Sequence, residues 1–183
     1  MKIESQDIIS RNGKLITLRE ATIDDAPELL KVVRSYIEES EFIPYAKGEF
    51  QMTLEQEREW IQAFIDQDNS LLLLATCDGN ILGNISVNGL QRQMMRHRAM
   101  LGIGLLNEWR NEGIGYALMN AAVEWSRKNP TLEFLSLETY ASNTWGQQVY
   151  RKLGFKEVGR QEKYIKTSAD KYEDNVIMSL CVK

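Results

Sequence analysis

The stretch from residue 101 to 125 constrains this chain most, because an apolar strand pattern passes through a polar turn into a glycine-rich helix start. Arg110, Gly113 and Gly115 form an R-x-x-G-x-G pattern in that turn. The first N–H groups of a helix lack intrahelical partners, and the helix dipole adds partial positive charge there. Glycines let an anion approach such a backbone. The stretch predicts a phosphate site, and a helix start that simply needs glycine is the open alternative.

Two common phosphate motifs do not fit this turn. A dinucleotide-binding fold needs a third glycine where this chain has Leu118. A P-loop needs Gly-Lys followed by Ser or Thr, and that tripeptide does not occur in the sequence. The turn therefore has to be interpreted together with the rest of the chain.

A second motif, N-T-W-G-Q-Q-V-Y-R-K-L-G-F, runs from Asn143 to Phe155. Asn143 and Tyr150 are seven residues apart, so they share one face of a helix. Taken alone, they fit a helix N-cap and a core tyrosine. Together with the R-x-x-G-x-G turn, the motif resembles the GCN5-related N-acetyltransferase (GNAT) superfamily, closest to its amino-acid, ribosomal-protein and polyamine N-acetyltransferases. The family pattern is N-x-x-A-x-x-L-Y-x-K-x-G-F, and Gly146 and Val149 depart from it.

Hydrophobic periodicity predicts one α/β (α+β) domain over residues 1–183, with a mixed, mainly antiparallel seven-stranded sheet and four helices on both faces. We expect 1–14 to be an N-terminal extension, 15–67 the acceptor side and 71–183 the cofactor-binding core. The predicted strands cover 15–19, 71–77, 81–90, 99–106, 132–140, 155–166 and 175–182. The predicted helices run from Thr22 to about Glu38, Thr53 to Asp68, Gly113 to Pro130 and Asn143 to Leu153.

The resemblance implies acetyl-CoA as cosubstrate, with no metal. It implies that the strand from Ile103 to Leu105 offers backbone groups to the pantetheine arm, which Asn143 also binds. It implies that the pyrophosphate lies in a cradle made by Arg110, Asn111, Glu112, Gly113, Ile114, Gly115 and Tyr116. Lys152 belongs to the second motif and is counted with the cofactor-binding residues. Tyr150 is then the general acid that protonates the departing thiolate.

One position departs from the family in a way that bears on mechanism. Relatives often carry glutamate in the strand before the phosphate turn, where this chain has Met100. An ammonium acceptor must lose a proton before it attacks, and a thioether cannot accept one. Glu138, in the strand before Asn143, is the first candidate for a replacement base, and Glu49 is the second. An exposed glutamate that is merely solvated is the open alternative for both.

Composition limits the kinds of partner and the compartment that we expect for this protein. The net charge of −4 and a pI near 5.2 argue against nucleic acid. No apolar run resembles a signal sequence or a membrane span, and two cysteines are too few for a disulfide framework, so we expect a cytoplasmic protein. Five residues would give the acceptor side an acidic, aromatic rim: Glu38, Glu39, Glu41, Tyr45 and Glu49.

The function expected from these features is acetyl transfer to a primary amine by direct attack in a ternary complex. The acceptor would be a small amine, an amino acid or the amine of a protein or peptide, and an acidic rim suits such a cation. The alternative is a non-catalytic acyl-CoA-binding sensor or interaction module, which the loss of glutamate at Met100 favours. Either protein would be a monomer or a homodimer.

Overall fold

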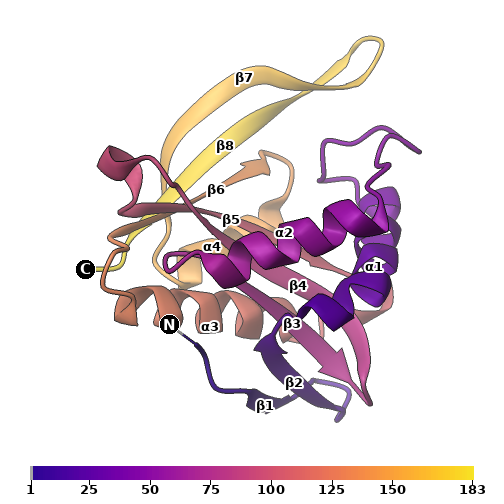
Figure 1. Ribbon diagram of the computed structural model, residues 1–183. Coiled ribbons are helices and arrows are strands. Elements are labelled where there is room, and N and C mark those ends of the chain that lie inside the picture. The colour runs from indigo at the N-terminus through magenta and orange to yellow at the C-terminus, as the bar shows by residue number, and fades with distance from the viewer. Residues whose placement is uncertain (1) are drawn as a thin grey trace.

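A mixed sheet of eight strands runs through residues 2–183, the part of the chain that the computed structural model describes (Figure 1). The strands lie in the order β1-β2-β3-β4-β5-β6-β8-β7, and every neighbouring pair is antiparallel except β5 with β6. The strands are β1 Gln6–Ile9, β2 Leu15–Glu20, β3 Leu71–Cys77, β4 Asn80–Gly89, β5 Arg98–Leu105, β6 Phe134–Tyr140, β7 Lys156–Ser168 and β8 Lys171–Cys181. The helices are α1 Ala26–Glu39, α2 Leu54–Asp66, α3 Ile114–Lys128 and α4 Thr144–Lys152, and three short 3-10 turns join them at Ile23–Asp25, Gln93–Met95 and Asn107–Trp109.

The prediction of seven strands was wrong by one, because β1 lies in the segment expected to be a plain extension. Gln6 to Ile9 pairs with Leu18 to Leu15 of β2 and covers the outer edge of that strand. The four residues are half polar, and Ile9 remains 66% exposed. Backbone pairing rather than side-chain burial therefore makes β1 a strand, and hydrophobic periodicity does not detect it.

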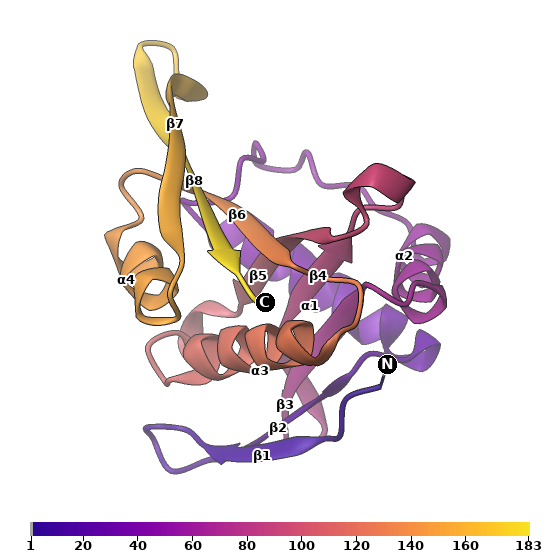
Figure 2. The same ribbon diagram turned by 90° about the vertical axis from the view of Figure 1, so that its left-hand side faces the viewer.

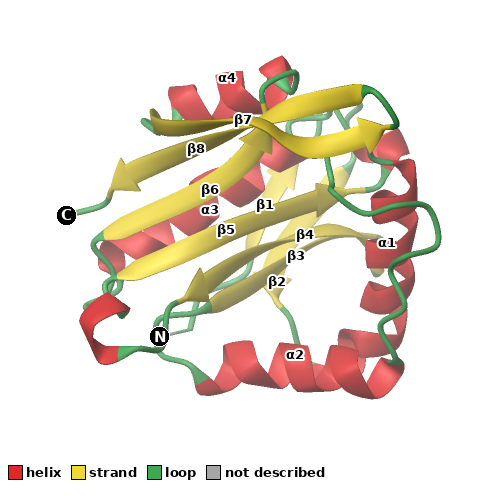
Figure 3. Cartoon of the chain, turned by 90° about the horizontal axis from the view of Figure 1, so that it is seen from above, coloured by secondary structure: helices red, strands yellow, loops and turns green. Residues whose placement is uncertain are grey.

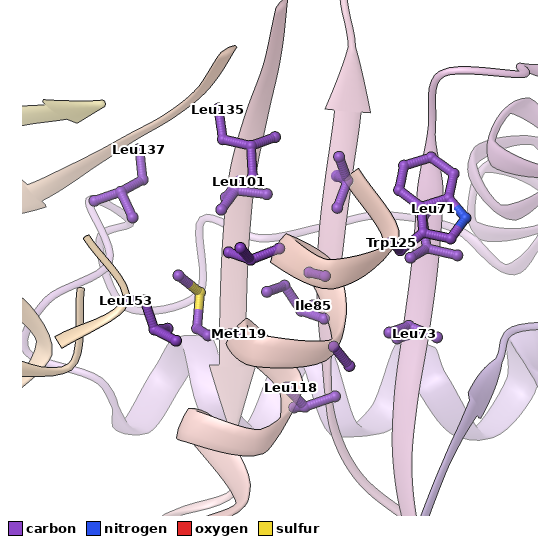
Figure 4. Packing of buried hydrophobic residues seen from close by; sticks show 14 of the residues in the cluster. Leu71, Leu73, Ile85, Leu101, Leu118, Met119, Trp125, Leu135, Leu137 and Leu153 are labelled. Atoms are coloured by element: carbon purple, nitrogen blue, oxygen red, sulfur yellow. The ribbon is translucent and has the colours of Figure 1, made fainter. Parts of the chain in front are cut away.

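The predicted placement of helices on both faces is confirmed by two separate cores. Helices α3 and α4 pack on one face, where Leu118 and Met119 of α3 approach Ile85 of β4 (Figure 4). Helices α1 and α2 pack on the other face, against Leu72 and Leu74 of β3. No helix within residues 2–183 has the length and apolar character that crossing a membrane requires.

Helix α2 begins where its capping box predicts. The Gln56 backbone N–H donates to Thr53 Oγ1 at 3.3 Å, and the Thr53 N–H donates to the Gln56 side chain at 2.8 Å. The buried stripe of this helix consists of Glu57, Ile61 and Phe64, whereas Ile65 is 54% exposed. A glutamate thus occupies a core position of this helix.

The parallel pair β5 and β6 holds together over only three residue pairs. Arg98 to Met100 pairs with Phe134 to Ser136, and no further pair joins the two strands in the described chain. Beyond that point β5 stays bonded to β4 as far as Leu105, and β6 stays bonded to β8 as far as Tyr140. The strands lie side by side at their starts and apart at their ends (Figure 3). The sheet is therefore open at its middle.

The last two strands form a long hairpin that extends beyond the rest of the fold (Figures 1 and 2). A short turn joins the two strands, because β7 ends at Ser168 and β8 begins at Lys171. One arm of this hairpin closes the sheet beside β6, and its tip lies near the loop between α1 and α2.

Candidate active site

A cavity of about 940 Å³ lies at the opening between β5 and β6. Residues 101–105 of β5 form one wall and residues 137–139 of β6 form another, and further residues come from α1, α2, α4, β4 and the neighbouring loops. Its size suits a small-molecule site. Seven of the predicted site residues line it: Ile103, Leu105, Arg110, Asn111, Glu138, Asn143 and Tyr150.

Tyr150 lies on α4 with its side chain 8% exposed and its ring 6.4 Å from that of Phe155. Its hydroxyl has no hydrogen-bond partner within residues 2–183, although it belongs to the cavity wall. Burial raises the pKa of this phenol from 10 to about 12, so it is fully protonated at neutral pH. A protonated, unpartnered hydroxyl at a cavity wall is able to donate to a ligand.

Asn143 caps α4, as the simpler sequence interpretation allows. Its Oδ1 accepts from the Gly146 N–H at 3.0 Å, and its Nδ2 donates to Thr139 Oγ1 at 3.0 Å. The same side chain lines the cavity. Its main structural task is therefore to fix the first turn of α4, which in turn sets the position of Tyr150 two helical turns later.

The predicted phosphate turn leads into α3 through Gly113, the N-cap, whose φ of 86° lies in the left-handed region. A glycine is suited to this conformation, and no other group comes within 4 Å of the place where a Cβ would sit. Arg110 lines the cavity, and its Nε donates to the Leu105 carbonyl at 3.2 Å. The guanidinium is thereby tied to the end of β5 at the mouth of the turn.

Six predicted residues lie outside the cavity wall: Glu112, Gly113, Ile114, Gly115, Tyr116 and Lys152. Ile114 is fully buried in the α3 core, so only its backbone could meet a ligand. Tyr116 and Lys152 are exposed, and Gly115 packs near Leu105. Their assignment to cofactor binding stays a prediction.

Sequence reasoning missed Arg11, which lines the same cavity from the turn between β1 and β2. Its Nη1 donates to the Asn111 carbonyl at 3.0 Å, and its backbone N–H donates to the Glu112 carbonyl at 3.1 Å. The Asn12 N–H donates to the Glu112 carboxylate at 2.8 Å. The N-terminal hairpin thus holds the phosphate turn in place. Because the two partners are 100 residues apart in the sequence, no local pattern predicts this contact.

The two predicted bases have different positions. Glu138 lines the cavity from β6, is exposed, and accepts from Asn175 Nδ2 at 2.8 Å. Glu49 lies outside this cavity and accepts from the Ala46 N–H at 2.7 Å. Met100 is not part of the wall, and its sulfur accepts from Ser136 Oγ at 3.1 Å. The structure therefore brings Glu138, but not Glu49, to the cavity that holds Tyr150.

A third carboxylate, Glu57 of α2, was also missed and lies in the cavity wall. It is 1% exposed, its Oε1 has no hydrogen-bond partner in the described chain, and burial raises its pKa from 4.5 to about 7. In the sequence it looks like an acidic residue favoured near a helix start. Its spacing from Ile61 and Phe64, four and seven residues, is the signal that places it on the buried face.

A second cavity, of about 860 Å³, lies between the α1–α2 loop and the β7–β8 hairpin. Glu41, Tyr45 and Glu49 of the predicted acidic rim line it, whereas Glu38 and Glu39 do not. The segment 42–44 borders both cavities. Within residues 2–183, no group of three or more His, Cys, Asp or Glu side chains is placed to hold a metal ion.

Residues 16–156 match the family described as "Acetyltransferase (GNAT) domain". The chain belongs to the GNAT acetyltransferase family. The resemblance to this family that was inferred from the two motifs is thereby confirmed. GNAT enzymes are acyltransferases that use acetyl-CoA as cosubstrate, and the opening between β5 and β6 is where this GNAT chain has its large cavity.

Relatives with assigned activities are N-acetyltransferases. L-amino acid N-acetyltransferase AaaT from Escherichia coli K12 is 29% identical over 105 residues, which cover 57% of this chain and 65% of that protein. The match thus spans just under two thirds of the relative's length. An N-alpha-acetyltransferase from Sulfurisphaera tokodaii is 26% identical over 171 residues, 89% of this chain and 93% of that one.

Solved GNAT structures share the whole architecture. A GNAT-family acetyltransferase from Streptococcus pneumoniae is 28% identical with a TM-score of 0.86, covering 91% of this chain and 99% of that chain. The yncA protein from Salmonella typhimurium, solved with its cofactor acetyl-CoA, has a TM-score of 0.81 at 14% identity, covering 92% and 94%. At that identity the second likeness concerns the fold alone.

Proposed function

We propose that this protein transfers the acetyl group of acetyl-CoA to a primary amine, by direct attack of the amine in a ternary complex. The observation that carries this function is the shared cavity, which Arg110 of the phosphate turn, the unpaired part of β5 and the Tyr150 hydroxyl all border. These are the three groups that a thioester-linked nucleotide needs along its length: a phosphate site, a strand edge and a proton donor.

The cofactor would lie with its pantetheine arm along β5 and its pyrophosphate at the start of α3. From Leu101 onward, β5 has no strand partner on its β6 side in the described chain, so backbone groups there are available to amides of the arm. The first N–H groups of α3 and the Arg110 guanidinium would meet the phosphates. Residues 71–183 would hold most of the cofactor, and residues 15–67 would form the acceptor side.

Tyr150 would act on the leaving sulfur. A phenol of pKa about 12 transfers its proton to a thiolate of ordinary pKa near 8.5 against a free-energy difference of about 5 kcal/mol. The apolar surroundings that raise the pKa of Tyr150 also disfavour a thiolate held beside it, and this narrows the difference. The hydroxyl would therefore stabilise the developing thiolate by donating a hydrogen bond and protonate it as the C–S bond breaks.

The acceptor would be a small amine, an amino acid or the N-terminus of a protein or peptide. Support comes from the two curated relatives, which are named for L-amino acids and for N-alpha groups. The acidic residues Glu41 and Glu49 of the second cavity suit a cationic acceptor that approaches from the hairpin side.

The test is an acceptor panel of L-amino acids, a tripeptide with a free N-terminus and spermidine, each incubated with acetyl-CoA while free thiol is measured. Thiol release that depends on the amine, with an acetylated product of the expected mass, supports the proposal. If acetyl-CoA binds and no amine releases thiol, the protein is a binding module rather than an enzyme.

A further inference from the structure

Glu57 carries an ionisable group at a position where α2 otherwise buries only apolar side chains. Glu57, Ile61 and Phe64 share the inward face of the helix, and all three are buried. A buried carboxylate without a hydrogen-bond partner destabilises a fold, and such groups are rare in proteins for that reason. Packing would be better served by leucine or methionine here, so the carboxylate calls for a chemical explanation.

No cation neutralises this carboxylate within the described chain. Desolvation is the one influence acting on its pKa, and none of the ion pairs in residues 2–183 includes it. The titratable neighbour is Tyr36 of α1, and its hydroxyl already donates to Asn84 Oδ1 at 3.1 Å. Burial, together with the charge of Glu57, raises the pKa of Tyr36, so this phenol stays neutral. Since no residue within 2–183 pairs with Glu57, a ligand in the cavity is a source from which it could gain a partner.

The cavity that Glu57 lines also reaches the middle of β5. A Cβ on Gly102 would come within 4 Å of a single group, Ser86 Oγ, so little covers the strand there. At Gly104, by contrast, a Cβ would overlap the Tyr36 ring. Gly102, Gly104 and Met100 point to the same side of β5, because side chains alternate along a strand. The strand itself offers no proton acceptor on this side, and α2 places a carboxylate there instead.

We propose that Glu57 is the general base of the acetyl transfer, removing a proton from the ammonium group of the acceptor. This inference rests on the proposed function, since it concerns the acceptor of that reaction. A cation is the partner that an unpaired carboxylate in a cavity attracts most strongly, and an ammonium group supplies both the positive charge and a transferable proton. Glu138, the base predicted from the sequence, is instead exposed to solvent and bonded to Asn175.

Glu57 would act on the acceptor before the C–N bond forms. A lone pair on a Glu57 oxygen takes one proton from the ammonium, which leaves a neutral amine and a neutral carboxylic acid. The nitrogen lone pair forms the C–N bond with the acetyl carbon, and the C–S bond breaks with its electron pair passing to sulfur. The sulfur takes a proton from Tyr150, which regains one from solvent, and both the nitrogen and Glu57 release one proton to solvent. The products are an amide, a thiol and one proton.

The base must be ionised before it can act, so the rate depends on pH. Because burial raises the pKa of Glu57 to about 7, the ionised fraction increases through neutrality. The neutral phenol of Tyr36 does not titrate in this range. A carboxylate whose pKa lies near the working pH is an effective general base.

The experiment compares wild type, Glu57→Gln, Glu57→Asp and Glu55→Gln, using the best acceptor from the panel of L-amino acids, tripeptide and spermidine. Glu55 is a matched control, because it lies on the same helix with its side chain 72% exposed. We expect Glu57→Gln to lower kcat by about 10²–10⁴-fold, the usual contribution of a positioned base, with acetyl-CoA affinity unchanged. Glu57→Asp should retain part of the activity, and Glu55→Gln should match wild type.

The pH profile separates a base from a structural residue. Wild-type kcat/KM should rise with pH through about 7, and this limb should disappear in Glu57→Gln. If Glu57→Gln raises KM for the amine and leaves kcat alone, the residue binds the cation and is not the base. If Glu57→Gln keeps the wild-type kcat and the same rise of kcat/KM with pH, the inference is also overturned. The activity of the wild type would still support the proposed function in that case. An inactive wild type would defeat both.

Discussion

The role of the Tyr150 hydroxyl can be tested alone, because a phenylalanine at this position keeps the aromatic ring and lacks only the hydroxyl. That hydroxyl bonds to no other described residue, so the fold should not depend on it. We expect Tyr150→Phe to reduce kcat by about 10²–10⁴-fold while the Kd for acetyl-CoA changes little. Steady-state kinetics and equilibrium binding measure the two quantities. Wild-type turnover in this variant would show that Tyr150 only packs against Phe155.

Glu57 has a consequence for stability as well as for catalysis. Its pKa is about 7 in the folded chain and near 4.5 when exposed, so between these values the folded state binds more protons than the unfolded state. Wild-type stability should therefore fall as pH rises from about 4.5 to 7, by up to about 3 kcal/mol, whereas Glu57→Gln lacks this loss. Denaturant unfolding of both proteins at pH 5 and pH 8 measures it. A difference between them that stays constant with pH would contradict the buried, unpaired carboxylate.

The phosphate turn can be tested as an element through Gly113. The site of its missing Cβ is open, so Gly113→Asp and Gly113→Asn introduce no overlap and differ mainly in charge. Both residues tolerate a positive φ better than most. We expect the aspartate to lower acetyl-CoA affinity at least tenfold more than the asparagine, because its carboxylate would face the pyrophosphate. Isothermal titration compares them, and equal affinities would place the phosphates elsewhere.

The N-terminal hairpin contacts the phosphate turn, although the two segments are far apart in the sequence. Arg11 lines the cavity and bonds to the phosphate turn, whereas Lys14 on the same hairpin does not line the cavity. Arg11→Ala should weaken acetyl-CoA binding about three- to tenfold, because that is the contribution of an exposed charge-assisted hydrogen bond. Lys14→Ala should have no effect on this binding. The difference should shrink at high salt. If the two changes weakened acetyl-CoA binding equally, Arg11 would contribute only its positive charge and no specific contact.

Local signals in the sequence predicted the elements that local contacts determine. Helix α1 carries the apolar residues Leu29, Val33 and Ile37 at intervals of four, and the β3–β4 hairpin turns at Asp78-Gly79; both are local patterns of the kind that periodicity detects. What the sequence concealed depends on partners far along the chain. Pairing with β2 makes β1 a strand, packing of α2 on the sheet buries Glu57, and a contact across a hundred residues brings Arg11 to the turn.

At the scale of the whole molecule, acetyl-CoA should stabilise the fold. The proposed site uses β5, the α3 start and α4, which come together only in the folded chain. A ligand at about 100 times its Kd adds about 2.7 kcal/mol to the free energy of unfolding. Thermal unfolding with and without millimolar acetyl-CoA measures this, and desulfo-CoA, which lacks the thioester, controls for nucleotide binding. An unchanged Tm would contradict the cofactor site.

The divergence of β5 from β6 leaves both strands with an unpaired edge in the interior of the sheet. Unpaired strand edges template aggregation, and proteins usually cover, charge or shorten them. The outer edge strand β7 carries many charged residues and β1 has only four residues, which are familiar protections. The inner edge of β5 instead faces α4 and β6 across a cavity of about 940 Å³. If the pantetheine arm binds along β5 as proposed, the space that would admit this slender cosubstrate would leave little room for the strand of a second sheet.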